Sequence, residues 1–198
     1  MKIIIILNII FLLLSNVNAT EDKNKIAILV NDNVITNYDI EQRIKMFAIL
    51  NQINITPENS NSITNSIVNE LIDNLLKIEK INEYNISVKD TDIERLENQY
   101  FRKTGISKDK IFELMEFNDV DTDQFYQMLY NDIAWQTLIS RLYYRITSVS
   151  DEEIEELLNQ DPMISREAAE QIIMDKQLDL KSNKMLRDLR DEATIEYK

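Results

Sequence analysis

Histidine and cysteine are absent from these 198 residues, glycine occurs once and proline twice. Without histidine, the sequence lacks the usual general base of Ser-His-Asp and Cys-His catalysis and a common zinc ligand. Without cysteine, no disulfide can form, so stability has to come from packing. A single glycine also argues against phosphate-binding loops and sheets with many turns. The sequence therefore predicts a mainly helical protein that holds no cofactor and no metal.

Acidic residues outnumber basic ones by 35 to 22, which gives a net charge of −13. An acidic surface repels the phosphates of nucleic acids and of anionic lipids. We therefore expect no nucleic-acid partner.

The first 19 residues have the features of a cleavable secretory signal. Lys2 is followed by an apolar run over residues 3–14, and Val17 and Ala19 fit the small-residue rule for cleavage after Ala19. The run is shorter than the roughly 20 apolar residues that a membrane span requires, so no stable membrane insertion is expected after cleavage. This pattern predicts export of the chain with cleavage of the signal. Without residues 1–19, whose only charge is Lys2, 21 basic residues face 35 acidic ones, a net charge of −14.

Residues 25–50 predict a short β-hairpin that leads directly into a helix. Apolar residues fill 26–30, residues 31–33 are the Asn-Asp-Asn of a tight turn, and Val34 and Ile35 form the return strand. Thr36 and Asp39 have the spacing of a capping box at the start of a helix.

Helical periodicity continues through most of the remaining chain. The sequence predicts a polar loop at 51–62, an apolar central helix at 63–81 and a helix that is capped by Asp90 or Thr91 and ends at Gly105. Further helices are expected from Ser107, from Asp121 to Ile146, after a second capping box at Ser150 and Glu153, and along the tail from residue 165. Residues 193–197 alternate like a strand that could pair with the hairpin.

The stretch VNDNVITNYDIEQRI, at 30–44, resembles the start of the N-terminal domain of SurA-type periplasmic chaperones. The later ISVKD at 86–90 and ITSVSDEEI at 146–154 occur in the order that the same family shows. The resemblance implies an all-α fold with minor β structure: a helical bundle with an N-terminal β-hairpin and a returning C-terminal helix and short strand.

After residue 154 the sequence departs from the family pattern. One or two parvulin-type prolyl isomerase domains normally follow, whereas here a connector at 159–163 leads into a tail that resembles the family's C-terminal helix. We therefore expect one SurA-like domain over 20–198, with a core at 25–159 and a clasp helix and strand at 165–198. We expect no enzymatic activity, and residual isomerase activity is the least favoured alternative.

Aromatic and methionine side chains are the candidates for a peptide-binding groove, because they offer adaptable apolar contact area. At helical spacing such residues are also typical of a core, which is the alternative for Phe125 and Trp135. The candidate groove residues are Phe112, Met115, Tyr126, Met128, Tyr130, Trp135, Tyr143 and Tyr144.

Asp119, Asp121 and Asp123 alternate as in a calcium-binding loop. The pattern lacks the glycine at the sixth position and the glutamate at the twelfth that such a loop needs. Acidic residues at a helix N-terminus explain the spacing better.

The family resemblance implies an ATP-independent periplasmic chaperone that binds unfolded or nascent outer-membrane proteins, as a monomer or as a clasp-swapped dimer. The alternative is a structural or assembly subunit that holds one dedicated periplasmic partner. A chaperone predicts weak, promiscuous binding in a flexible groove, whereas a dedicated partner predicts a flat, well-packed apolar patch.

Overall fold

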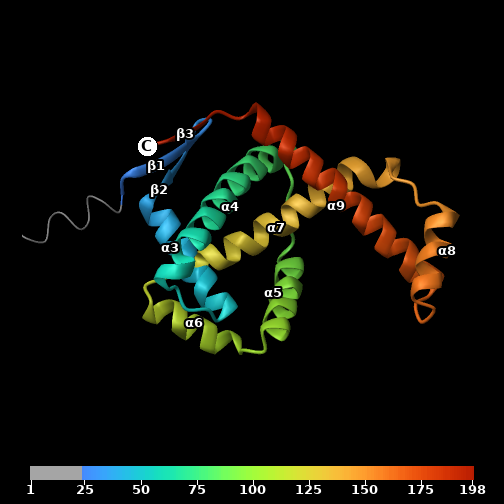
Figure 1. Cartoon of the computed structure of the whole chain (residues 1–198), viewed down its shortest axis with the longest axis horizontal. Helices are drawn as coiled ribbons and strands as arrows, with labels where there is room; N and C mark the ends of the chain where they lie inside the picture. The colour runs from blue at the N-terminus through green and yellow to red at the C-terminus, as the bar shows by residue number, and fades with distance from the viewer. Residues whose placement is uncertain (1–23) are drawn as a thin grey trace, which may run out of the picture. The chain divides into compact units, whose positions relative to one another are not determined.

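The computed structural model describes residues 24–198, and the predicted signal peptide lies outside these residues (Figure 1). The described chain is mainly helical, as predicted, with one small sheet. Its elements in chain order are β1 (Ile26–Val30), β2 (Asn33–Thr36), α3 (Asn37–Asn51), α4 (Pro57–Glu83), α5 (Asp90–Thr104), α6 (Lys108–Phe117), α7 (Thr122–Tyr143), the 3₁₀ turn η2 (Tyr144–Ile146), α8 (Asp151–Gln160), α9 (Arg166–Glu192) and β3 (Ile195–Tyr197).

These residues form two compact units. Unit 1 contains residues 24–72, 109–121 and 194–198, and unit 2 contains 73–108 and 122–193. Unit 2 includes α7 and α9 together, so it crosses the expected limit between a core and a clasp. The single chaperone domain over 20–198 stays a prediction.

The sheet of unit 1 joins the two ends of the described chain. Its strand order is β2-β1-β3, and both pairings are antiparallel. Val30 lies opposite Asn33 on one side and Ile195 on the other. The turn residue Asn31 has a left-handed φ of 52°, and its N–H donates to the carbonyl of Thr194 at 2.9 Å. The predicted hairpin and its pairing with the last strand are both confirmed.

Helix α3 begins at the predicted capping box. The Thr36 hydroxyl accepts from the Asp39 N–H at 3.2 Å, and the Asp39 carboxylate accepts from the Thr36 N–H at 2.8 Å. Further along α3, the buried Gln42 donates from Nε2 to the carbonyl of Asp119 at 2.9 Å. This bond ties α3 to the turn after α6, and Asp119 has the left-handed φ (53°) of a tight turn. The buried apolar side chains of unit 1 are Ile28, Val30, Ile35, Met46, Leu50, Ile67, Ile72, Ile111, Met115 and Val120.

Two predicted helix starts are wrong. Helix α4 begins at Pro57, inside the predicted loop, because proline has no N–H to leave unpaired and its fixed φ suits the first helical position. The Thr56 N–H also donates to the Asn59 side chain at 2.7 Å. Helix α5 follows Lys89, which makes no side-chain cap, so neither Asp90 nor Thr91 is the capping residue.

An aromatic cluster holds α5 against α7 in unit 2. Phe125 is fully buried, and its ring centroid lies 5.5 Å from those of Tyr100 and Phe101 and 5.7 Å from that of Tyr126. Gly105 ends α5 with a φ of 70° and donates its N–H to the carbonyl of Phe101, as predicted.

A second core of unit 2 joins the end of α4, α7 and α9. Its buried members are Ile81, Ile86, Ala134, Trp135, Leu138 and Ile139, and α9 adds the partly buried Leu178, Met185, Leu186 and Leu189. Asp73 on α4 and Arg190 on α9 form an ion pair of 2.6 Å beside this core. The long tail helix is therefore held by apolar packing along α7 and by one charge pair near its end.

Helix α8 packs on the first turns of α9 in the same unit (Figure 1). Ser150 and Glu153 form the predicted capping box of α8, and Ser165 caps α9 by accepting from the Ala168 N–H at 3.2 Å. The small core beneath consists of Ile154, Ala169 and Ile173.

Candidate functional site

A cleft of about 440 Å³ lies between α7 and α9 in unit 2. Helix α7, the turn η2 and the first half of α9 supply its walls. The lining residues are Trp135, Gln136, Ile139, Ser140, Tyr144, Gln171, Asp175, Leu178, Asp179 and Ser182.

Trp135 forms part of the wall of this cleft and is held in one orientation. Only 5% of it is exposed, and its indole Nε1 donates to the Ser182 hydroxyl at 2.8 Å. The ammonium of Lys77 lies 5.8 Å from the ring centroid, within the range of a cation–π contact. Trp135 is therefore a fixed and mostly buried part of the cleft wall.

Apolar and polar side chains both line the cleft, and its rim is acidic. Asp175 and Asp179 lie one helical turn apart on α9, and no cationic side chain is among the lining residues. The Gln171 amide donates to the Asp175 carboxylate at 2.7 Å, which fixes one side of the rim. Tyr144 is 51% exposed, and Ile146, two residues further along the chain, is 73% exposed. Such a surface favours apolar segments and disfavours acidic ones.

The structure brings two of the eight candidate groove residues together, Trp135 and Tyr144. Tyr130 and Tyr143 pack partly buried against the core that α7 shares with α9, and Met128 is half-buried on the same helix. On α6, in unit 1, Phe112 is half-buried and Met115 is fully buried. The groove formed by all eight residues stays a prediction.

Tyr126 takes part in a polar network of unit 2. Its hydroxyl donates to the Glu97 carboxylate at 2.9 Å, and Lys108 reaches the same carboxylate at 2.7 Å. The bond to Glu97 raises the pKa of Lys108 above its ordinary value, and contact with Tyr126 adds to this shift. This arrangement supports the α5–α7 packing.

Sequence reasoning missed the α9 side of the cleft. Gln171, Asp175, Leu178 and Ser182 recur at spacings of three and four residues, which places them on one helical face. That periodicity could have identified the face. The helix that lies opposite this face could not be identified, because α7 ends more than 20 residues before α9 begins.

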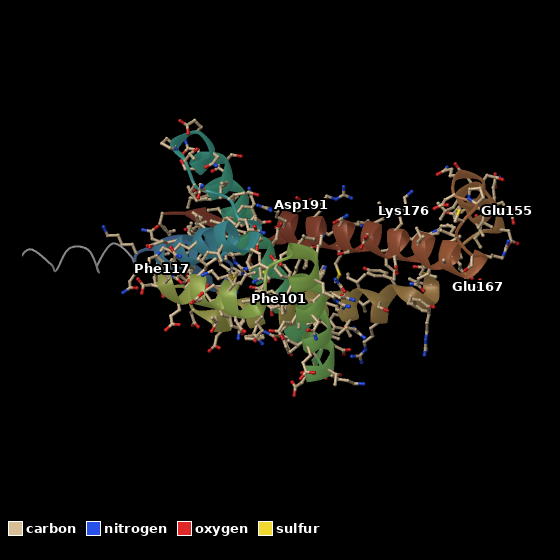
Figure 2. All side chains as sticks on the ribbon, turned by 90° about the horizontal axis from the view of Figure 1, so that it is seen from below. Phe101, Phe117, Glu155, Glu167, Lys176 and Asp191 are labelled. Atoms are coloured by element: carbon tan, nitrogen blue, oxygen red, sulfur yellow. The ribbon has the colours of Figure 1, made fainter. Side chains whose placement is uncertain are left out.

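A second groove, also of about 440 Å³, lies between α8 and α9. Its lining residues are Glu153, Glu156, Leu157, Gln160, Ile172, Ile173, Lys176, Gln177 and Leu180. Glu155 and Glu167 lie near one end of α9, and Asp191 lies near its other end (Figure 2). Hydrogen bonds from the backbone N–H and then the hydroxyl of Ser150 lower the pKa of Glu153. This groove thus also combines apolar side chains with ionised carboxylates.

Residues 24–198 show neither a metal cluster nor a membrane-spanning helix. No group of three or more acidic side chains there is arranged to hold a metal ion. No helix in this range is both long and apolar enough to cross a membrane.

The architecture is that of a helical protein whose last strand pairs with its opening hairpin, with clefts bounded by its long tail helix. Residues 1–139 match the family model of the SurA-like N-terminal domain. The chain belongs to this family, which confirms the resemblance seen in the sequence. Between α8 and α9 only a five-residue connector, 161–165, is present, and no parvulin domain lies within residues 24–198.

One curated relative and one solved structure illustrate the similarity. The protein named Chaperone SurA of Buchnera aphidicola subsp. Schizaphis graminum is 23% identical over 159 residues, which cover 76% of this chain and 37% of that protein. This chain thus spans well under half of the relative's length. A chain from the structures of the SurA-like chaperones PEB4 and Cj1289 of Campylobacter jejuni is 19% identical, with a TM-score of 0.39 over 70% of this chain and 50% of that one.

Proposed function

We propose that this chain is an ATP-independent periplasmic chaperone that holds unfolded or nascent outer-membrane proteins and aids their folding or delivery. Membership of the SurA-like N-terminal domain family is the observation that carries the proposal. The secretory signal predicted at 1–19 supports the periplasmic location.

The proposed mechanism is transient burial of apolar client segments. Strands of membrane barrels alternate apolar and polar residues, and their unpaired edges aggregate in water. Leu178 and the half-exposed Tyr144 line the α7–α9 cleft above the buried Trp135 and Ile139. Ile146, two residues after Tyr144, exposes further apolar area. Contacts of this kind are individually weak, so the client can dissociate without ATP.

The charge of the chain supports the same role. A large net negative charge keeps a protein carrying an unfolded client in solution, because like-charged complexes repel each other. Asp175 and Asp179 also place negative charge at the cleft itself. We expect acidic clients to be held less well than neutral or basic ones.

The test is light scattering from a denatured β-barrel membrane protein diluted into buffer with increasing amounts of residues 20–198. We expect suppression of aggregation near an equimolar ratio. No suppression at a several-fold excess would refute the proposal and favour a subunit with one dedicated partner. Proline-limited refolding of a model substrate should not be accelerated, and an acceleration would support residual isomerase activity instead.

A double variant locates the client contact. Tyr144→Ser with Ile146→Ser removes an exposed apolar side chain that lines the cleft and a second one two residues further along the chain. We therefore expect weaker suppression with an unchanged circular dichroism spectrum. The control is Phe117→Ser, which removes an apolar side chain that is 85% exposed in unit 1. An equal loss in this control would contradict the assignment of the contact to the α7–α9 cleft.

A further inference from the structure

The groove between α8 and α9 exposes large apolar side chains on a strongly acidic background. Ile172 is 48% exposed and Leu180 is 61% exposed, eight residues apart on one face of α9, and Leu157 of α8 lines the same groove. A solvent-exposed helix face normally carries polar residues, whereas this face of α9 carries exposed apolar ones.

The helices around the groove carry far more acid than base. Residues 151–180 contain ten acidic and two basic residues. One base, Arg166, is paired with Asp151 and with Glu155, the latter at 2.8 Å. The other, Lys176, lines the groove together with Glu153 and Glu156, so the lining side chains carry a net charge of −1. Glu156 lines the groove, and it has no basic side chain within 4.0 Å among the described residues. The groove therefore has apolar contacts and an available negative charge.

We propose that this groove docks short polypeptide segments in which apolar residues alternate with lysine or arginine. Apolar side chains of the segment would pack on Leu157, Ile172 and Leu180, and a cation would pair with Glu156. The inference rests on the proposed chaperone function and specifies the chemistry of the client segments that unit 2 accepts.

The dimensions and charge of the groove argue for this occupant. The ten residues of α8 extend over about 15 Å, which is the length of about five residues of extended chain. A second copy of the protein would bring the same acidic face to the groove, and like charges placed together disfavour binding. A short segment of apolar and basic residues fits the length of the groove and complements its negative charge.

The test measures fluorescence anisotropy of three labelled nine-residue peptides titrated with residues 20–198. One peptide alternates leucine and lysine, the second replaces each lysine with glutamate, and the third replaces each leucine with serine. We expect the leucine–lysine peptide to bind at least about tenfold more tightly than either of the others, and its affinity to fall as salt is added. Equal binding of the lysine and glutamate peptides would overturn the proposal.

Two variants place the peptide in the groove. Glu156→Gln should weaken binding about two- to fivefold, the range expected for one exposed ion pair. Leu180→Asn should weaken it about five- to tenfold, because it removes a partly buried apolar contact. Glu153 is avoided because it caps α8. The matched controls are Glu94→Gln, an exposed carboxylate on α5, and Phe117→Asn in unit 1, and both should bind the peptide normally.

The outcomes separate this inference from the proposed function. Aggregation suppression without peptide binding would overturn the groove assignment and leave the chaperone proposal standing. Peptide binding that depends on Glu156 and Leu180, without aggregation suppression, would support the groove and refute the chaperone function. A dimer in sedimentation that Leu180→Asn dissociates would overturn the inference, because the groove would then be an interface between two copies.

Discussion

Replacing Ser182 with alanine should destabilise unit 2 by removing the acceptor of a buried donor. The indole N–H of Trp135 donates to the Ser182 hydroxyl at 2.8 Å, and Trp135 is only 5% exposed. The serine lies on α9 and the tryptophan on α7, so this hydrogen bond joins the two helices that bound the cleft.

The magnitude follows from the desolvation of the indole. A buried donor left without an acceptor costs about 1–3 kcal/mol. Because Trp135 and Ser182 both line the cleft, water can reach the vacated position, and we expect about 1–2 kcal/mol in the free energy of unfolding. With a urea m-value of about 2 kcal/mol/M, the midpoint falls by about 0.5–1 M.

The assay is urea unfolding followed by circular dichroism and by fluorescence of Trp135, the only tryptophan in the chain. A double-mutant cycle supplies the control: in a Trp135→Phe background no donor remains, so Ser182→Ala should change the free energy of unfolding by less than about 0.5 kcal/mol. An equal loss in both backgrounds, or none in the wild type, would refute the assigned contact between α7 and α9.

Three further predictions concern local stability. Thr36→Ala removes the cap of α3 and should cost about 1 kcal/mol in urea unfolding, whereas Thr36→Ser should cost much less. Because the bonds from Ser150 lower the pKa of Glu153, the ionised carboxylate stabilises the fold above pH 4.5, and this stabilisation is lost as the pH falls through the lowered value. The wild type should therefore unfold at higher urea than Glu153→Gln at pH 7 but not at pH 2, and a constant difference would contradict the assignment. Phe125→Ala empties the centre of the aromatic cluster and should cost about 3–5 kcal/mol, visible as a lower thermal midpoint, whereas Phe125→Leu should cost less than half as much.

The features that the sequence predicts correctly depend on interactions between residues that are close together in the chain. The capping pair Thr36 and Asp39 is three residues apart, as is the pair Ser150 and Glu153, and both form as expected. Gly105 adopts the left-handed conformation for the same local reason. The start of α4 was misplaced because several polar residues around Pro57 suggested a loop, although proline favours the first helical turn.

The candidate site could be predicted only in part, because it is made by contacts between distant segments. Helical periodicity placed Trp135 on an apolar face, but the choice between core and groove depends on which helix lies opposite. Its partner Ser182 is 47 residues away. Met115 could not be placed from the sequence for the same reason. A methionine side chain suits an adaptable groove, but Met115 lies in the packed interior of unit 1 because of elements far away in the chain.

Helix α9 lines both grooves of unit 2, with Asp175 and Asp179 toward α7 and Ile172 and Leu180 toward α8. Under the proposed function, a client segment held in one groove would keep the adjoining part of its chain near the other, at an effective concentration of about millimolar. Two weak contacts can then retain an unfolded chain that neither holds alone, while each still opens rapidly. Under the proposed function, this arrangement would let the chain combine retention with release without ATP. It also means that the double variant beside the α7 cleft and the Leu180 variant should each weaken holding without abolishing it.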